Sequence, residues 1–253
     1  MSANPEQSKR FENKVALVTG AANGIGRATA FRLACEGASV ALLDLDGDKV
    51  EQVAAEIRAL GSSALAFQVD VTNPEAIQAA VATILAQFKK IDILVNSAGA
   101  GWHQGAPFHE MPIGSWQWVL DLNINGTLNV IHAVVNHMIE NRYGRIVNLA
   151  SIAAKTGLPR LSTYAASKGA IVSFTKTLAM ELGSHGITVN CVSPGMVSTT
   201  EETPPCSGTF LGRKSAPSEQ AAAIAFLASD EAAFVTGADY LVDGGRTLGP
   251  RGS

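Results

Sequence analysis

The sequence predicts an α/β fold with a doubly wound, seven-stranded parallel sheet and helices on both faces. Short apolar runs alternate with segments of helical periodicity along most of the 253 residues, which is typical of parallel α/β sheets. The apolar runs are continuous rather than alternating, as strands covered on both faces require. No linker, repeat or low-complexity segment interrupts the series. We therefore expect a single domain over residues 14–245.

Each expected element has a local justification. Apolar runs predict strands at residues 14–20, 39–46, 63–71, 91–99, 144–151, 187–195 and 237–245. Helical spacing predicts helices at residues 24–38, 48–61, 73–90, 113–141, 162–184 and 216–230. Gly37 and Gly61 are expected to end two of these helices, and Asn73 followed by Pro74 is expected to begin another.

Three segments fall outside this pattern. Residues 1–13 are polar and predict a flexible leader, and residues 246–253 predict a short tail. Residues 200–216 contain two adjacent prolines and no periodicity, which predicts a loop. A long loop beside the carboxyl ends of parallel strands is a candidate substrate lid.

Composition and charge exclude several classes of function. The net charge is −3, and the chain has no basic stripe of the kind that binds nucleic acid. No apolar run approaches the ~18 residues of a membrane span, and the first residues lack the apolar core of a signal peptide. Three cysteines spaced far apart indicate neither a disulfide framework nor a zinc site. We expect a cytoplasmic protein that binds neither nucleic acid nor membrane.

A glycine-rich turn, TGAANGIG at residues 19–26, lies between the first strand and the first helix. Gly20 permits a tight turn, and Gly24 and Gly26 leave room for the backbone to approach a pyrophosphate at the helix N-terminus. Glycines alone are weak evidence, because many serve only as turns. Their place between a strand and a helix favours dinucleotide binding.

Asp44 ends the second strand, eighteen residues beyond Gly26. Its carboxylate can accept hydrogen bonds from the adenosine ribose and would repel a 2′-phosphate. No Arg or Lys stands within residues 20–26 or 45–48 to neutralise such a phosphate. This charge pattern predicts NAD rather than NADP. The alternative is that Asp44 only caps the following turn.

The next two strand ends carry further candidate cofactor residues. Asp70 and Val71 follow the third strand, where an adenine ring would lie in this fold, although Asp70 could equally cap a turn. Asn96, Ala98 and Gly99 follow the fourth strand. The small residues here would let a cofactor lie across the strand tips.

Three polar residues could converge on one substrate oxygen. Tyr164 and Lys168 are four residues apart and therefore share one face of a helix. Ser151 lies at the end of a predicted strand, thirteen residues before Tyr164. Lys168 and a positively charged nicotinamide ring would both favour the phenolate of Tyr164. A unit charge at ~4–5 Å contributes roughly 3–4 kcal/mol at an effective dielectric of ~20. We therefore expect a lowered pKa for Tyr164, which starts near 10.

These motifs together resemble one known family. They are TGAANGIG, Asp70-Val71, NSAG at 96–99, Asn123, Ser151, YAASK at 164–168 and SPGMVST at 193–199. The chain resembles the short-chain dehydrogenases/reductases, which have a Rossmann fold, from Lys14 to about Gly245. It departs from the family at Ser97 and Ala150, where the family often has a second Asn and a second Ser. The loop after Thr199 is also shorter than is usual.

The resemblance implies an NAD-dependent interconversion of a secondary alcohol and a ketone. Tyr164 would be the general acid and base, Lys168 would lower its pKa and hold the cofactor ribose, and Ser151 would polarise the substrate oxygen. Asn123 would hold a water next to Lys168, or would be only a structural hydrogen-bonding residue. The implied cofactor-binding residues are Gly20, Asn23, Gly24, Ile25, Gly26, Asp44, Leu45, Asp70, Val71, Asn96, Ala98, Gly99, Tyr164, Lys168, Pro194, Gly195, Val197 and Thr199.

The substrate is less defined than the reaction. The candidate pocket residues are Gly101, Trp102, His103, Gln104, residues 152–158 and Met196, together with residues 200–212 of the loop. A sugar-like alcohol, an acyl thioester or a steroid-like ketone would fit. Rival functions are a lyase or epimerase that uses bound NAD without net turnover, a 3-oxoacyl thioester reductase, and a catalytically silent NAD-binding module.

Other chemistries lack their motifs. The five histidines show no HExxH or clustered spacing, so no metal site is expected. GxSxG and GxxxxGK are absent, which argues against a hydrolase and a P-loop NTPase. By resemblance, the helices at 113–141 and 162–184 would pair with those of other subunits to form a homotetramer.

Overall fold

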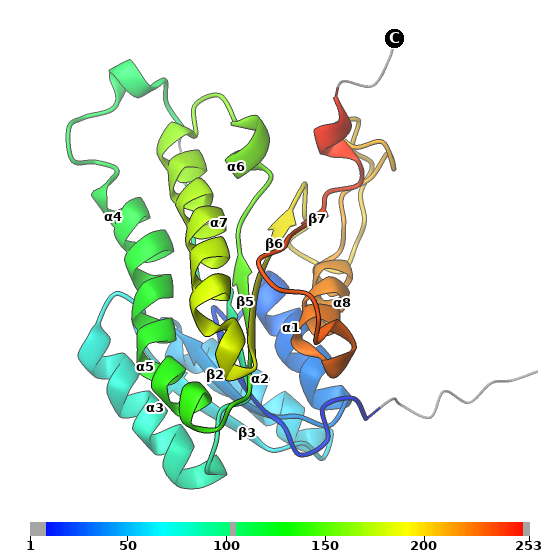
Figure 1. Cartoon of the computed structure of the whole chain (residues 1–253). Helices are drawn as coiled ribbons and strands as arrows, with labels where there is room; N and C mark the ends of the chain where they lie inside the picture. Colours follow the sequence, from blue (N-terminus) through cyan, green and yellow to red (C-terminus); the bar gives the residue numbers. More distant parts are fainter. Residues whose placement is uncertain (1–8, 102–104, 250–253) are drawn as a thin grey trace, which may run out of the picture.

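The computed structural model describes residues 9–101 and 105–249. A single seven-stranded sheet has the order β3-β2-β1-β4-β5-β6-β7, and each neighbouring pair is parallel. Helices cover both faces (Figure 1). The predicted fold class is therefore confirmed. The strands are β1 (Val15–Thr19), β2 (Ser39–Asp44), β3 (Ala64–Gln68), β4 (Ile93–Asn96), β5 (Gly144–Leu149), β6 (Ile187–Pro194) and β7 (Asp239–Val242).

The helices divide between the two faces of the sheet. Side chains of α1, α2 and α8 pack into the hydrophobic core on one face. Side chains of α3, α5 and α7 form the core on the other face. The helices are α1 (Gly24–Cys35), α2 (Gly47–Ala59), α3 (Pro74–Phe88), α4 (Gln117–Leu120), α5 (Gly126–Glu140), α6 (Ala153–Thr156), α7 (Ser162–Leu182) and α8 (Pro217–Ala228). None of the helices in the described ranges is long and apolar enough to cross a membrane.

The direction of chain winding reverses between β1 and β4. From β1 the chain proceeds outward through β2 to β3, and it then returns to place β4 on the other side of β1. Helices connected to the two strands therefore lie on opposite faces, and a crevice opens at the carboxyl ends of the strands. Ligands bind at such switch points in open α/β sheets.

The helix predicted over residues 113–141 is wrong at its start and in its middle. Regular helix begins only at Gln117, because Gly114 has a φ of +82° that a right-handed helix does not accept. A π-helical turn over Asp121–Asn125 then separates α4 from α5. Such turns are rare and are frequently found at functional sites.

The predicted leader is too long. Phe11 is only 1% exposed and packs into the core beside α1. Its backbone N–H donates to the Glu36 carbonyl at 2.9 Å, and the Arg10 guanidinium pairs with the Glu36 carboxylate. One aromatic residue in a polar stretch was enough to anchor residues 9–13. Residues 1–8 lie outside the described part of the chain.

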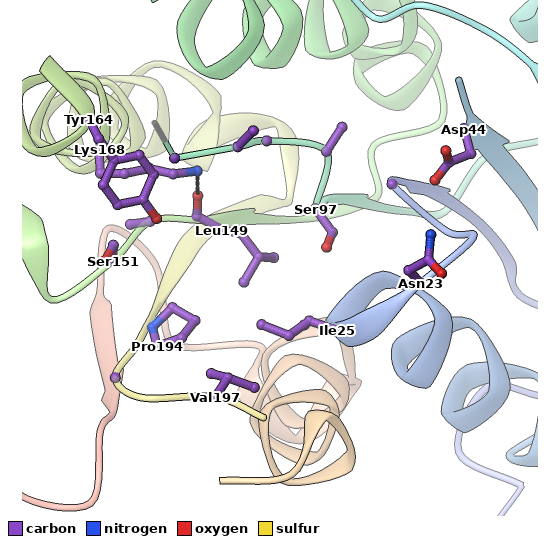
Figure 2. A pocket seen from close by; sticks show the side chains of 17 residues that line it. Asn23, Ile25, Asp44, Ser97, Leu149, Ser151, Tyr164, Lys168, Pro194 and Val197 are labelled. Carbon is purple, nitrogen blue, oxygen red and sulfur yellow. Dashed lines mark hydrogen bonds between the residues drawn. The ribbon is translucent and has the colours of Figure 1, made fainter. Parts of the chain in front are cut away.

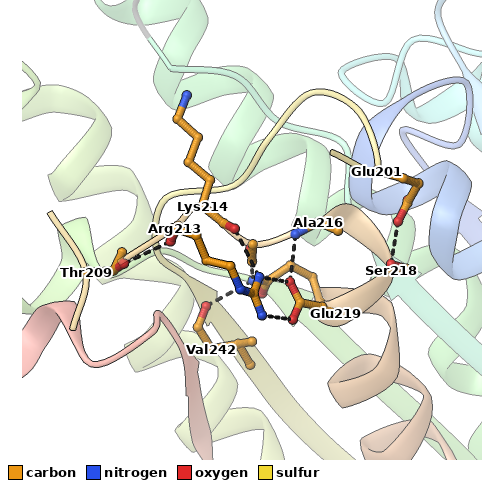
Figure 3. Close-up of polar contacts among 10 residues, drawn as sticks. Glu201, Thr209, Arg213, Lys214, Ala216, Ser218, Glu219 and Val242 are labelled. Atoms are coloured by element: carbon orange, nitrogen blue, oxygen red, sulfur yellow. Dashed lines mark hydrogen bonds and ion pairs between the residues drawn. The ribbon is translucent and has the colours of Figure 1, made fainter. Parts of the chain in front are cut away.

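The predicted tail is ordered over its first residues, and it contacts the 200–216 loop. Arg246–Leu248 form a short 3₁₀ helix, labelled η5. The N–H groups of Phe210 and Leu211 donate to the Gly244 carbonyl just before it. Figure 3 shows how the other end of the loop is held, through paired hydrogen bonds from Arg213 to Glu219 of α8 at 2.6 and 2.7 Å. Closure of this loop as a lid stays a prediction.

Candidate active site

A cavity of about 520 Å³ lies at the carboxyl ends of β1, β4, β5 and β6 (Figure 2). A second cavity, of about 230 Å³, lies at the ends of β2 and β3. The two share Gly20, Asp44, Ala98 and Gly99 in their linings. A ligand that spans the switch point would therefore contact both.

Close backbone contacts shape the glycine turn. Gly20 has a φ of +63°, and a Cβ on it would lie 2.8 Å from the Ala98 nitrogen. A Cβ on Gly26 would lie 2.0 Å from the Gly20 carbonyl oxygen. Gly26 therefore allows α1 to pack against the turn, which corrects the prediction that it leaves room for a pyrophosphate. Gly24, with a φ of +52°, has open space where its Cβ would be. Asn23 and Ile25, beside it, line the larger cavity.

Asp44 both caps turns and faces the cavities. Its carboxylate accepts hydrogen bonds from the Ala22 N–H at 2.9 Å and from the Asp46 N–H at 3.0 Å. Asp44 therefore caps the turn, as the alternative interpretation of the sequence predicted. Each carboxylate oxygen can accept a further bond, and Asp44 lines both cavities. Capping and ligand binding are therefore compatible at this residue.

The smaller cavity has mostly apolar walls. Leu45, Val71, Leu43, Val69 and Leu122 line it, so a flat aromatic ring would find apolar surface there. Asp70 also lines it, and its carboxylate accepts hydrogen bonds from the N–H and hydroxyl of Thr72 at 2.8 and 2.7 Å. Asp70 therefore caps this turn, which was the alternative to a contact with the adenine ring.

Asn96 does not line either cavity, and its predicted cofactor contact is not supported. Its side chain is buried and donates to the Asn148 side chain at 2.9 Å. The loop after β4 is held instead by Thr19, whose hydroxyl accepts from the N–H groups of Ser97 and Ala98 at 3.1 and 3.0 Å. We did not predict this role of Thr19, although its place directly before Gly20 is a signal for it.

Ser151, Tyr164 and Lys168 converge at one end of the larger cavity (Figure 2). Ser151 follows β5, and the other two residues lie one turn apart on α7. The Lys168 ammonium donates to the Leu149 carbonyl at 2.8 Å and lies 5.8 Å from the centre of the Tyr164 ring. The three predicted residues are thus brought together by one strand end and one helix.

Burial sets the ionisation of this group. Burial raises the pKa of Tyr164 above its ordinary value of 10, and a hydrogen bond from the Ser151 hydroxyl opposes that rise. Burial also lowers the pKa of Lys168 from 10.5 to about 8. Desolvation therefore sets the pKa of Tyr164 in the protein without nucleotide, and Ser151 is the group that favours the phenolate. The expectation that Lys168 and a bound nicotinamide lower this pKa concerns the nucleotide complex and stays a prediction.

Comparison with known proteins agrees with this geometry. The short chain dehydrogenase family matches residues 14–205. D-threitol dehydrogenase from Mycolicibacterium smegmatis is 41% identical, over 94% of this chain and 95% of its own length. (2S)-[(R)-hydroxy(phenyl)methyl]succinyl-CoA dehydrogenase subunit BbsD from Thauera aromatica is 39% identical, over 94% of this chain and 98% of its own. NAD⁺-bound xylitol dehydrogenase has a TM-score of 0.87 at 35% identity, covering 93% of this chain and 99% of its own.

The chain belongs to the short-chain dehydrogenase family. The match covers most of the chain, and it includes the turn, the strand ends and α7, which form the two cavities. The family of oxidoreductases predicted from the sequence motifs is therefore confirmed.

The cavities of this short-chain dehydrogenase fit a nicotinamide adenine dinucleotide. The apolar smaller cavity suits an adenine ring, Asp44 lies between the two cavities, and the open N-terminus of α1 at Gly24 suits a pyrophosphate. A Cβ on Gly99 would lie 2.7 Å from Asn123 Oδ1 and 3.2 Å from Lys168 Nζ. Only glycine therefore leaves the side chains of Asn123 and Lys168 in these positions.

Asn123 is a structural hydrogen-bonding residue in this arrangement. It is fully buried in the π turn. Its side chain accepts from the Ala100 N–H at 3.1 Å, and donates to the Ala100 carbonyl at 2.9 Å and to Ser167 at 3.1 Å. These bonds tie the loop after β4 to α7. The water-holding role implied by the resemblance stays a prediction.

The predicted residues after β6 are only partly at the cavity. Pro194, Gly195 and Val197 line it, whereas Thr199 is exposed and lies outside its lining. Met196, a predicted substrate residue, lines a separate small cavity.

The remaining candidates divide into two groups. Trp102, His103 and Gln104 lie outside the described residues. Gly101, a predicted pocket residue, lines the larger cavity. The lining also includes four residues that the predictions missed, at positions next to the recognised motifs: Ser97, Ala100, Leu149 and Ala150. Within the described ranges, no group of three or more His, Cys, Asp or Glu side chains could hold a metal ion.

The lowered pKa of Lys168 predicts a pH-dependent stability. The unfolded chain keeps this proton up to about pH 10.5, whereas the folded chain releases it near pH 8. The buried ammonium therefore costs free energy below pH 8, and this cost disappears as the pH rises. From neutral pH to about pH 10, the free energy of unfolding of the wild type should rise relative to Lys168→Met by on the order of 2–4 kcal/mol.

Urea unfolding of the nucleotide-free protein at several pH values measures this difference. Lys176→Met is the matched control, because Lys176 is an exposed lysine of the same helix. A difference between wild type and Lys168→Met that does not change with pH would contradict the prediction.

Proposed function

We propose that this short-chain dehydrogenase interconverts a secondary alcohol and a ketone with NAD. The observation that carries the proposal is the convergence of Ser151, Tyr164 and Lys168 at one end of the cavity, with the Lys168 ammonium held by the Leu149 carbonyl. The Ser151 and Tyr164 hydroxyls can hold one substrate oxygen and exchange a proton with it. When bound, the nicotinamide accepts or supplies the hydride.

Tyr164 is the proton-exchanging residue in this proposal. A raised pKa keeps its phenol protonated at neutral pH, so it is ready to donate to the oxygen of a ketone. In the direction of alcohol oxidation it must first lose that proton, and the Ser151 hydrogen bond favours the loss. The Ser151 hydroxyl also polarises the substrate oxygen.

Lys168 supplies positive charge behind the tyrosine. Its Nζ donates one of its three N–H groups to the Leu149 carbonyl. The other two can donate to ribose hydroxyls at the cavity wall. With a pKa of about 8 it is mostly charged at neutral pH. A nearby cation stabilises the phenolate that forms during turnover.

Two other reactions fit the same residues. The name of the succinyl-CoA dehydrogenase relative gives a CoA thioester as substrate, which supports reduction of a 3-oxoacyl thioester as the second candidate. A lyase or epimerase that keeps its NAD bound would use the same proton transfers. A net change in NADH absorbance during turnover would indicate the alcohol or thioester reaction, whereas a lyase or epimerase would give no net change.

Removal of the Tyr164 hydroxyl tests the mechanism. Tyr164→Phe should lower kcat by on the order of 10²- to 10⁴-fold, with NAD binding retained. The rate of alcohol oxidation should rise with pH as Tyr164 loses its proton. Ser151→Ala should shift this rise to higher pH, because it removes the group that lowers the pKa of Tyr164.

Initial rates across a pH series, on a panel of alcohols and ketones, measure both effects. Ser162→Ala is the matched control, since Ser162 is an exposed serine at the start of the same helix. Full activity of Tyr164→Phe would show that another group exchanges the proton.

We also propose that NAD is preferred over NADP. The Asp44 carboxylate faces the cavities and would repel a 2′-phosphate. Two basic side chains of the neighbouring helices α1 and α2 have acidic partners: Arg27 pairs with Glu56 at 2.5 Å, and Lys49 pairs with Asp46 at 2.6 Å.

Asp44→Ser should narrow the preference for NAD over NADP in kcat/KM by at least about fivefold, since it removes a repulsion of more than ~1 kcal/mol. The control is Asp48→Ser, which removes an exposed carboxylate nearby. Loss of the turn hydrogen bonds of Asp44 would lower the activity with both cofactors, so the ratio of kcat/KM with NAD to kcat/KM with NADP reports the cofactor preference alone. An unchanged ratio in Asp44→Ser would contradict the assignment.

A cytoplasmic homotetramer is the proposed working form. Apolar side chains are exposed on two separate faces, with Trp118 and Met180 on α4 and α7, and Phe234, Tyr240 and Leu241 around β7. Two self-complementary faces on one chain build a tetramer with three two-fold axes. The three free cysteines are typical of a reducing compartment.

Light scattering on the purified chain tests the oligomeric state. Four copies are expected, and Met180→Lys should lower the mass to that of a dimer. A monomeric wild type would overturn the assembly and leave the proposed reaction untouched.

A further inference from the structure

A third cavity, of about 360 Å³, lies between the segment that follows Ser151 and the 200–216 loop. One wall is formed by Thr156, Gly157, Leu158 and Pro159, which belong to the segment that joins Ser151 to Tyr164. The opposite wall comes from residues 207–210 of the loop, and Arg246 and Gly249 complete the lining. The cavity is therefore bounded by the same chain segment that carries the two reacting hydroxyls.

Arg246 is the one charged residue in the described lining. Its Nη1 donates to the Gly208 carbonyl at 2.9 Å, and no carboxylate of the described residues lies within ion-pair distance of it. A guanidinium has five N–H donors, so most of its hydrogen-bonding capacity is available to a ligand. Unpaired positive charge in an otherwise uncharged cavity favours an anion.

The surrounding chain holds this guanidinium in place. The Asp243 carboxylate accepts from the N–H groups of Gly245 and Thr247 at 2.9 and 2.8 Å, and these bonds order the turn before and around Arg246. A Cβ on Gly208 would lie only 2.3 Å from Arg246 Nη1. The absence of a side chain at Gly208 is therefore what lets the guanidinium occupy its position.

Arg213 provides a contrast in the same loop. Its guanidinium forms two hydrogen bonds to Glu219 (Figure 3), and these bonds lower the pKa of Glu219 to about 2. Arg213 is thus neutralised and fastens the loop to α8. Arg246 has no such acidic partner among the described residues, so a purely structural role does not account for its charge.

We propose that Arg246 binds an anionic group on the substrate, at the far end from the carbonyl. This inference rests on the proposed alcohol and ketone chemistry. The helix α6 begins two residues after Ser151 and ends at Thr156 in the cavity wall. Its four residues span about 6 Å, so a substrate that reaches from Ser151 along α6 to this cavity needs several bonds between its two functional groups. The substrate class is a ketone or secondary alcohol with a carboxylate or phosphate several bonds away.

Two measurements test the proposal on the full chain with NAD bound. The first is calorimetric titration with heptanoate and with inorganic phosphate. Arg246→Gln should weaken binding of the preferred anion by roughly 10- to 100-fold, as expected for lost charged hydrogen bonds. Gly208→Ala should weaken it as well, because it displaces the guanidinium without removing its charge. Tighter binding of phosphate than of heptanoate would assign a phosphate, and the reverse would assign a carboxylate.

The second measurement is reduction of 7-oxooctanoate compared with its methyl ester. The wild type should prefer the acid in kcat/KM, and Arg246→Gln should lose most of that preference. Lys214→Gln, which removes a positive charge from the same loop outside the cavity lining, should keep it. A purely structural role of Arg246 would lower the rates on acid and ester alike.

The outcomes separate this proposal from the proposed reaction. Anion binding that is equal in wild type and Arg246→Gln, or an unchanged preference for the acid, would overturn the anion site. Arg246-dependent anion binding without reduction of any ketone would support the site and would overturn the proposed reaction instead.

Discussion

The candidate active site depends on one buried hydrogen bond, from the Lys168 ammonium to the Leu149 carbonyl. A buried ammonium is costly unless its N–H groups are satisfied, so this bond favours the position of α7 in which Lys168 reaches the end of β5. Tyr164 lies one helical turn before Lys168, and Ser151 lies two residues after Leu149. The bond that satisfies the lysine therefore also brings the two hydroxyls together.

The nucleotide end of the site depends on backbone contacts rather than on side chains. A Cβ on Gly20 would overlap the backbone of Ala98, and a Cβ on Gly26 would overlap the Gly20 carbonyl. Thr19 holds the loop after β4 through two N–H groups. These contacts keep the strand tips and α1 close, which leaves the cavities their shape. Asp44 is then the charged group that faces both of them.

The substrate end has a different construction, since its walls come from segments without regular structure. The 200–216 loop is fastened to α8 by Arg213 and Glu219, and to the end of β7 through the Gly244 carbonyl. Loops held on a rigid scaffold can differ between relatives without disturbing the sheet. This separation explains how one reaction centre could serve different alcohols, and why the unpaired Arg246 is informative about this chain.

The sequence by itself determined the succession of strands and helices, the glycine turn and the group Ser151, Tyr164 and Lys168, because each depends on local periodicity or on short spacings along the chain. Only the tertiary structure decided that Phe11 is anchored in the core, that Gly114 delays the helix, that Asn96 turns away from the cavities and that burial raises the pKa of Tyr164. It also brought Arg246 to the loop. These features depend on contacts between residues far apart in the chain and on exclusion of water, and neither is encoded in a local pattern.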